Sequence, residues 1–386
     1  MTLKTTTLGE IAVFSQGIQV GIKQQKDAAE PGYVRFIRII DYTQNITEKR
    51  YIKDPGDKYR VTAEDIVMVR YGTPGLIGRG KEGVIANNLF QIKVLNDEIT
   101  NDFLVHYLSQ SHIQEYLSTQ GSATMPALNF GQLKIVSINY PSLEEQKRIV
   151  AILDQAFADI DKARATAERN LKNARELFDS YLQQVFSQRG EGWEIYNLGN
   201  LCELISGQHI DAKDYNSERT GIGYLTGPSD FGQIYPVVTK WTEHPKRTAI
   251  KGDILITVKG SGVGKINVMN DKELAISRQL MAIRPTNAKG EILYWFVSTQ
   301  YQYFQSLANG AAIPGISRGD VLDLKLCLPD MKSQVNLGKD ISEFDSRIIA
   351  LKKIYEGKII ALDELKKSIL QKAFTGELTK SKGIAA

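Results

Sequence analysis

Apolar residues follow a helical spacing in two long stretches of the chain. From Ser142 to about Gln188, and again from Asp330 to about Thr375, there is no proline, and apolar residues recur three and four positions apart. This spacing predicts helices of the coiled-coil type, each with one buried face. At 1.5 Å per residue, about 45 residues predict a helix roughly 65–70 Å long.

The apolar stripes of the two helices differ in size. The first stripe, which Asn170 interrupts, is Ile149, Leu153, Ala156, Ile160, Ala163, Ala167, Ala174 and Leu177; the second is Leu337, Ile341, Phe344, Ile348, Leu351, Tyr355, Ile359, Leu362, Leu365 and Ile369. An alanine-rich stripe is complementary to a stripe of large side chains, so we predict an antiparallel intramolecular coiled coil. The alternative is that each helix pairs with another subunit.

The segment before each helix has a different pattern. Runs such as YVRFIRII, DIVMVR and DILITV are rich in β-branched residues and are bounded by Gly, Pro, Asn and Asp, which predicts strands. One stretch of each segment, NDFLVHYLSQSHIQEYL or GEILYWFVSTQYQYFQSL, has helical spacing instead. The sequence therefore predicts α+β domains at 1–141 and 190–329, the first followed by a long helix at 142–189 and the second by a C-terminal long helix and tail at 330–386.

The two halves of the chain repeat each other in the same order. The matched segments are 7–17 with 197–207, 65–79 with 253–265, 121–129 with 310–317, and 180–186 with 368–374. Pro141 and Gln146 also match Pro329 and Gln334, both at an offset of 188 residues. This many matches in register predict an internal duplication, and so a pseudo-twofold symmetric molecule.

Composition and charge narrow the class of protein only slightly. The hydrophobic share of 42% and the charged share of 24% are ordinary for a globular protein. There are 15 basic and 14 acidic residues in 1–141, and 14 of each in 190–329, so charge alone does not argue for nucleic acid. We expect no membrane span and no signal peptide. Cys202 and Cys327 are typical of buried thiols in a reducing cytoplasm.

The candidate binding residues lie in a glycine-rich loop of each half and in polar clusters near it. Neither Ile66–Lys81 nor Ile254–Asn270 contains an acidic residue, so their backbone and cations could approach DNA phosphates. Asn and Gln can bind an adenine edge, and Arg can bind a guanine. The candidates are Gln16, Gln19, Lys23, Arg70, Tyr71, Thr73, Arg79, Lys81, Asn87 and Asn88 in the first half, and Gln208, Lys213, Lys259, Ser261, Lys265, Ser277, Arg278 and Gln279 in the second. The alternative is an ordinary hairpin with a solvated face.

Patterns of catalysis or cofactor binding are not recognisable in the sequence. GSGVGK at Gly260–Lys265 resembles a phosphate loop, but Lys259 stands where the pattern requires glycine, and Ile266 where it requires Ser or Thr. The four histidines do not have zinc-site spacing beside a pair of cysteines. We therefore expect a binding protein without a catalytic site, a metal or a cofactor of its own.

Two motifs connect this architecture to a known family. The first long helix opens with PSLEEQKRIVAILD at Pro141–Asp154, and the chain closes with SILQKAFTGEL at Ser368–Leu378. Together with the duplicated plan, they resemble the specificity subunit of type I restriction-modification systems over essentially the whole chain. The second helix opening, PDMKSQVNLGKDI, departs from the usual pattern and keeps mainly Pro329 and Gln334. This departure leaves the architecture intact, but it bears on how a partner docks there.

The resemblance implies a non-catalytic subunit that binds double-stranded DNA. The domains at 1–141 and 190–329 would be target-recognition domains, each reading one half of a bipartite asymmetric site. The helices would set the spacer and dock two modification (methyltransferase) subunits. Restriction subunits, an ATP-dependent translocase and nuclease, would complete the complex. Partner subunits would use S-adenosylmethionine, and ATP with Mg²⁺, while this chain binds no cofactor. The alternative function is a scaffold of two α/β domains on a coiled-coil brace that binds proteins and not DNA.

Overall fold

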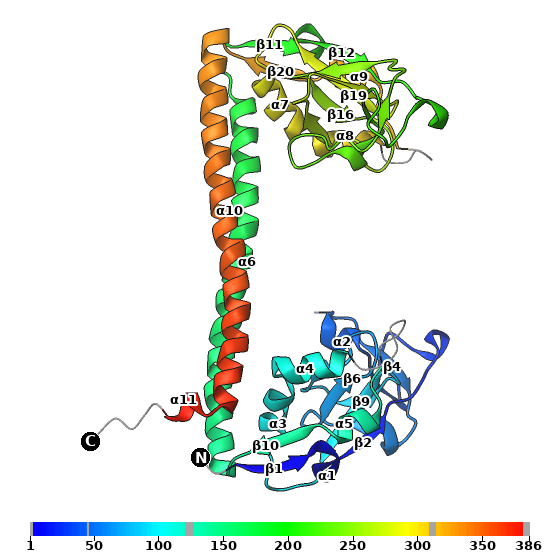
Figure 1. Ribbon diagram of the computed structural model, residues 1–386, viewed down its shortest axis with the longest axis vertical. Helices are drawn as coiled ribbons and strands as arrows, with labels where there is room; N and C mark the ends of the chain where they lie inside the picture. The colour runs from blue at the N-terminus through cyan, green and yellow to red at the C-terminus, as the bar shows by residue number, and fades with distance from the viewer. Residues whose placement is uncertain (1–2, 45, 120–126, 309–313, 381–386) are drawn as a thin grey trace, which may run out of the picture. The chain divides into compact units, whose positions relative to one another are not determined.

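The chain forms two compact units, each with one α+β domain and parts of two long helices. The computed structural model describes residues 3–44, 46–119, 127–308 and 314–380 (Figure 1). Unit 1 consists of Met1–Ala167 with Gly357–Ala386, and unit 2 consists of Glu168–Glu356. The matched segments 121–129 and 310–317 lie partly outside the described residues.

Short strands and short helices alternate in both α+β domains. The elements of the first domain are β1 (Lys4–Thr7), α1 (Leu8–Ile11), β2 (Ala12–Gln16), the 3-10 helix η1 (Ile22–Gln24), β3 (Tyr33–Ile37), α2 (Ile40–Thr43), β4 (Arg50–Lys53), η2 (Asp57–Tyr59), β5 (Arg60–Val61), β6 (Ile66–Val69), β7 (Ile77–Gly78), β8 (Gly83–Ile85), β9 (Leu89–Val94), α3 (Asn101–Leu108), α4 (Ser111–Ser118), α5 (Phe130–Lys134) and β10 (Ser137–Tyr140). The elements of the second domain are β11 (Glu194–Asn197), η3 (Leu198–Asn200), β12 (Cys202–Ser206), η4 (Ala212–Asp214), β13 (Ile222–Leu225), η5 (Pro228–Asp230), β14 (Trp241–Thr242), β15 (Thr248–Ile250), β16 (Ile254–Thr257), β17 (Ile266–Val268), β18 (Glu273–Ile276), β19 (Leu280–Pro285), α7 (Gly290–Thr299), α8 (Tyr301–Ala308), α9 (Arg318–Leu322) and β20 (Lys325–Leu328).

The sheets confirm the duplication inferred from the sequence. In the first domain the strand orders are β2-β9-β6-β7, β4-β3-β8-β5 and β1-β10. In the second they are β12-β19-β16-β17, β14-β13-β18-β15 and β11-β20, which is the same topology strand for strand. Even the parallel pair recurs, since β3 pairs with β8 and β13 pairs with β18 in parallel while the other ladders are antiparallel.

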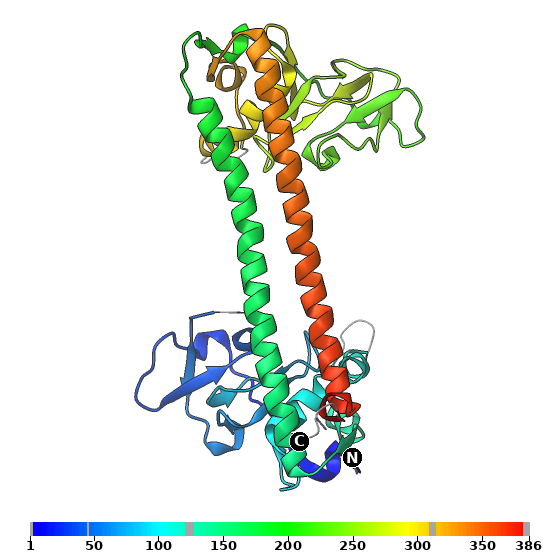
Figure 2. The same ribbon diagram turned by 90° about the vertical axis from the view of Figure 1, so that its left-hand side faces the viewer.

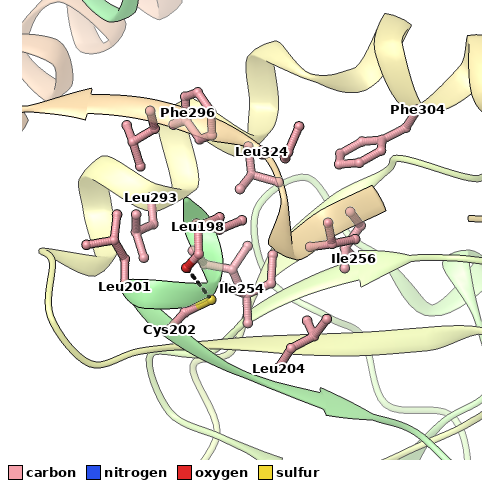
Figure 3. Close-up of a cluster of buried hydrophobic side chains, with 14 of the residues drawn as sticks. Leu198, Leu201, Cys202, Leu204, Ile254, Ile256, Leu293, Phe296, Phe304 and Leu324 are labelled. Atoms are coloured by element: carbon pink, nitrogen blue, oxygen red, sulfur yellow. Dashed lines mark hydrogen bonds between the residues drawn. The ribbon is translucent and has the colours of Figure 1, made fainter. Parts of the chain in front are cut away.

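The central strands are apolar because both of their faces are buried. In β16, Ile254 and Ile256 pack in the core beneath α7 and α8, beside residues such as Phe296 (Figure 3). Leu255, which points the opposite way, packs with Leu225 and other residues of the second sheet. A strand alternates its side chains between two faces, so two layers of core require an unbroken apolar run. The run IVMV in β6 is divided between two clusters of unit 1 in the same way.

The two long helices are confirmed by α6 (Leu143–Ser187) and α10 (Met331–Phe374), of 45 and 44 residues, with the short α11 (Glu377–Lys380) after them. Asp330 caps the start of α10, because the Ser333 hydroxyl and the amides of Ser333 and Lys332 donate to its carboxylate and lower its pKa. At the start of α6, the Glu145 amide donates to Ser142 Oγ in a long bond of 3.5 Å.

The helices pair antiparallel within each unit (Figure 2). In unit 1, Lys366 Nζ donates to Asp161 Oδ1 at 2.8 Å. In unit 2, Asn170 Nδ2 donates to the Tyr355 hydroxyl at 3.3 Å, so the residue that interrupts the apolar stripe has a polar partner across the helix pair. The intramolecular coiled coil is therefore confirmed, and pairing with a second subunit is not needed to bury these faces.

Two residues of the predicted stripes lie outside the buried seam. Leu177 is 52% exposed and Leu365 is 46% exposed. They are equivalent in the duplication, 188 residues apart. A regular α-helix has 3.6 residues per turn, so a stripe continued by steps of three and four drifts away from the partner helix. The assignment of these two leucines to the seam was therefore wrong.

The matching helix ends pack into the α+β domains. The Phe374 ring lies 5.3 Å from that of Phe103 and 5.2 Å from that of Tyr107, both on α3 of unit 1. In unit 2 the Phe186 ring lies 5.5 Å from that of Phe296 on α7. Each domain is thus held by the end of one long helix, as well as by the start of the other.

Candidate nucleic-acid interface

The two polar clusters singled out in the sequence occupy equivalent tight turns. Between β8 and β9, the Leu89 amide donates to Ala86 O at 2.9 Å, which places Asn87 and Asn88 at the two central positions. Between β18 and β19, the Leu280 amide donates to Ser277 O at 2.9 Å, which places Arg278 and Gln279 there. We call these the first and second reading turns. The central side chains of a β-turn are free of its closing hydrogen bond and can face a ligand.

A glycine crosses directly beneath each reading turn. A Cβ on Gly17 would lie 2.2 Å from the carbonyl oxygens of Ile85 and Ala86, and one on Gly207 would lie 2.1 Å from Ser277 O. The residue after each glycine is hydrogen-bonded to the strand that leads into the turn: the Ile18 amide donates to Ile85 O at 2.9 Å, and the Gln208 amide donates to Ile276 O at 3.0 Å. Only glycine permits this approach. The two glycines stand at the same place in the repeat, in SQG and ISG, but the sequence did not reveal why glycine is needed there.

The glycine-rich loops join the same places through backbone hydrogen bonds. The Arg70 amide donates to Asn88 O, and the Val258 amide donates to Gln279 O, both at 2.8 Å. The carbonyls of Arg70 and Val258 then accept from the amides of Leu128 and Ile316, at 2.9 and 3.0 Å. In each unit, four separate chain segments therefore meet at the reading turn.

Four of the predicted residues in the first half form one network at the first reading turn. Gln16 Nε2 donates to Asn87 O at 3.0 Å, and Asn87 Nδ2 donates to Gln19 Oε1 at 3.3 Å. The Tyr71 hydroxyl donates to Asn87 Oδ1 at 3.3 Å. The Asn87 amide is thereby oriented, and one of its N–H groups and one oxygen lone pair remain available.

The basic candidates of unit 1 differ in how far their charge is matched. Arg79 forms ion pairs with Glu64 at 2.9 Å and with Asp102, so its charge is already balanced. Arg70 instead lies over the ring of Phe90, 5.7 Å from its centroid, and forms no ion pair with the described residues. Arg70 is half-buried, and its own backbone amide is bonded to Asn88 of the first reading turn, so its guanidinium is a cation attached directly to that turn.

The other candidates of unit 1 lie farther along its loops. Lys81 lies 5.4 Å over the ring of Tyr42, whose pKa burial raises to about 12. Thr73 is exposed in the glycine-rich loop, and Lys23 is exposed in η1 beside Ile22, an isoleucine that is 83% exposed. Ile22 was not among the predicted residues, and in the sequence only its position among polar residues distinguishes it.

In unit 2 a buried polar group supports the second reading turn. Ser277 is 3% exposed, and its hydroxyl donates to Thr226 O at 2.6 Å. The amide of Gln279 donates to the same Ser277 Oγ at 3.2 Å. Asp230, which is 6% exposed and was not predicted, accepts from the amide and the hydroxyl of Thr226 at 2.6 and 2.8 Å. Ser277 is therefore a support for the turn and not a surface contact.

The remaining candidates of unit 2 are exposed. The exposed candidates are Arg278, Gln279, Lys259, Ser261, Lys265, Gln208 and Lys213. Ser261 and the two lysines near it belong to the glycine-rich loop between β16 and β17. The second site thus offers several cations to a polyanion, around a turn whose backbone is fixed from three sides.

Two further properties concern the described residues as a whole. Within the described ranges, no group of three His, Cys, Asp or Glu side chains is placed to hold a metal ion. Among these same residues, no helix is both long and apolar enough to cross a membrane.

Comparisons with known proteins give a consistent result. The profile of the family described as "Type I restriction modification DNA specificity domain" matches residues 2–168 and again residues 190–358. The putative type I restriction enzyme MjaX specificity subunit of Methanocaldococcus jannaschii is 28% identical over 385 residues, which cover 92% of this chain and 89% of that one. The type I restriction enzyme EcoBI specificity subunit of Escherichia coli is 22% identical over 382 residues, 90% and 80% of the two chains.

Solved structures share the fold. A chain from the study "Structural basis underlying complex assembly and conformational transition of the type I R-M system" superposes with a TM-score of 0.82, at 22% identity over 97% of this chain and 98% of that one. The HsdS subunit from Thermoanaerobacter tengcongensis superposes with a TM-score of 0.61, at 22% identity over 97% of both chains.

Proposed function

This chain belongs to the family of type I restriction modification DNA specificity domains, and from that premise we propose that it selects the DNA sequence for a type I restriction-modification complex. Each α+β domain reads one half of a bipartite site in double-stranded DNA. The two long helices set the spacer between the half-sites.

One observation carries the proposal: two reading turns of the same construction present different side chains. Asn87 and Asn88 stand in the first, and Arg278 and Gln279 stand in the second. Asn and Gln are suited to adenine edges and Arg to guanine, so the two domains read unlike half-sites. The cations of the glycine-rich loops contact phosphates and position the domain on the duplex.

The test is to purify the chain with its methyltransferase subunits and to map the bases that the complex modifies in random-sequence DNA. We expect a split motif with two different halves and a spacer of constant length, and binding that weakens steeply as salt is raised. Modification without sequence preference, or the absence of DNA binding at low salt, would contradict the proposal.

Partner subunits dock on the outer faces of the helix pair. Leu177 and Leu365 are equivalent, exposed and outside the seam, which supports two equivalent docking positions for two methyltransferase subunits. Serine at both positions should weaken capture of the methyltransferase while leaving the melting temperature unchanged, because neither leucine contributes to the core. A matched control, Gln155→Ser on the exposed surface of α6, should change neither. Unchanged capture by the double variant would remove these leucines from the interface.

This chain contributes no catalysis and binds no cofactor of its own. S-adenosylmethionine, and ATP with Mg²⁺, are used by the methyltransferase and restriction subunits. Incubating the isolated chain with labelled S-adenosylmethionine and DNA should leave the DNA unlabelled, and adding the methyltransferase should label it. Labelling by the chain alone would refute this part of the proposal. The alternative function, a scaffold that binds only proteins, is not favoured by the family to which the chain belongs.

A further inference from the structure

We propose that Arg278 reads a guanine in the half-site of the second domain, through two hydrogen bonds from its guanidinium to O6 and N7 in the major groove. The inference rests on the proposed function, because it assigns a base to one residue of that interface. It adds a specificity-determining arginine to the second domain, whereas the first domain has Asn87 at the equivalent position.

The backbone at Arg278 is held rigidly, as base reading requires. The preceding residue, Ser277, is buried; its amide donates to Leu225 O at 2.9 Å and its hydroxyl donates to Thr226 O at 2.6 Å. The following residue, Gln279, accepts from the Val258 amide at 2.8 Å. Gly207 passes beneath, so close to Ser277 O that no side chain fits between them. A side chain mounted on such a turn loses little further freedom on binding.

The other side chains of the reading turns differ from Arg278 in what they contact. A Cβ on Gly227 would lie 2.2 Å from Gln279 Oε1, so the Gln279 amide occupies the space above that glycine. Asn87, which stands at the position of Arg278 in the first domain, is bonded to Tyr71 and Gln19. Arg278 is exposed and has no hydrogen bond or ion pair with any residue that the structure describes. Arg278 is therefore the cation of the second turn and is free to bind.

The chemistry of the side chain selects the base. An arginine carries parallel N–H donors that match the two acceptors of guanine, O6 and N7, and no other base pair edge offers that pair. Lys259 and Lys265 also lie exposed in unit 2, but a lysine on a glycine-rich loop is a mobile point charge, which suits phosphate contact.

The experiment compares binding of the methyltransferase complex to its mapped site and to sites with single base analogues. Each guanine of the second half-site is replaced in turn by 7-deazaguanine, which lacks N7, and by inosine, which keeps both N7 and O6. We expect one 7-deazaguanine position at which the wild-type complex loses roughly 5- to 150-fold in affinity while inosine is tolerated. At that position Arg278→Gln, which removes the paired guanidinium donors and their charge, should no longer distinguish guanine from its analogue.

Lys259→Gln is the matched control, since it removes a cation of the same domain. It should weaken binding to all sequences alike and leave the modified motif unchanged. A uniform loss for Arg278→Gln would mean that Arg278 contacts phosphate, and an unchanged motif would mean that it contacts no base; either outcome overturns the inference. Neither outcome touches the proposed function, which fails only if the wild-type complex shows no sequence preference.

Discussion

The glutamines near the start of each long helix are buried polar ties whose strength can be measured. Gln146 is 0% exposed: its Nε2 donates to Glu98 O at 2.7 Å and to Pro141 O at 3.0 Å, and its Oε1 accepts from the Thr100 amide at 3.0 Å. These bonds connect the start of α6 to the segment that leads into α3. Methionine at this position would keep the volume and remove the hydrogen bonds.

The size of the effect follows from the bonds lost. Three hydrogen bonds at about 0.5–1.5 kcal/mol each predict a loss of about 1.5–4.5 kcal/mol for Gln146→Met. Gln334, the equivalent residue of unit 2, has two side-chain bonds, one accepted from the Lys289 amide and one donated to Pro329 O. Gln334→Met should therefore cost less, about 1–3 kcal/mol.

The assay must separate the two units. All three tryptophans, Trp193, Trp241 and Trp295, lie in unit 2, so fluorescence in a urea titration reports Gln334→Met directly. Unit 1 is better followed by hydrogen exchange at the Thr100 amide, which loses its acceptor in Gln146→Met. The exposed Gln155→Met is the control and should change neither signal. If Gln146→Met leaves Thr100 protected and stability within about 0.5 kcal/mol of wild type, the tie does not hold the domain to the helix.

Other positions give equally direct predictions. Gly17→Ala should abolish sequence-selective binding, measured by DNA retention in the complex, because its Cβ would lie 2.2 Å from Ala86 O; retained selectivity would show that the crossing can open. Asp253 is 1% exposed and lies 2.8 Å from Arg284. Asp253→Asn should lower the free energy of unfolding, measured by urea titration, by about 2–4 kcal/mol, and a loss below about 1 kcal/mol would contradict a buried ion pair. The pKa of Cys202 is raised to about 11 by burial, so at pH 8 a thiol reagent should react with it only after unfolding; rapid reaction of native protein would disprove this.

The architecture was readable from the sequence because its signals are local. The absence of proline and the three-and-four spacing predicted both long helices to within about a residue of Leu143–Ser187 and Met331–Phe374. The repeat predicted that both domains share one topology, which the strand orders confirm. The buried seam was predicted less well, because whether Leu177 and Leu365 face the partner helix depends on how far the apolar stripe has rotated around each helix by that point.

The candidate interface was only partly readable, because its partners come from distant segments. Sequence located the polar clusters, and the structure places them at two equivalent turns. Sequence did not reveal that Arg79 is paired with Glu64 and Asp102, which lie 15 and 23 residues away. Nor did it separate Ser277, which is buried, from Arg278, which is exposed, because burial is decided by the loops that fold over the turn. Which of these residues contact DNA stays a prediction.

Unit 1 is built from two separate stretches of the chain, and this affects the order in which its parts are synthesised. Its core contains Leu370 and Ala373, and Phe374 closes over Phe103 and Tyr107 of the first domain. A ribosome therefore delivers the opening domain long before the residues that cover it, whereas unit 2 is a single continuous stretch, Glu168–Glu356, and can be complete earlier. The apolar surface around α3 therefore stays uncovered while the whole of unit 2 is synthesised, and during that time it is accessible to chaperones and proteases.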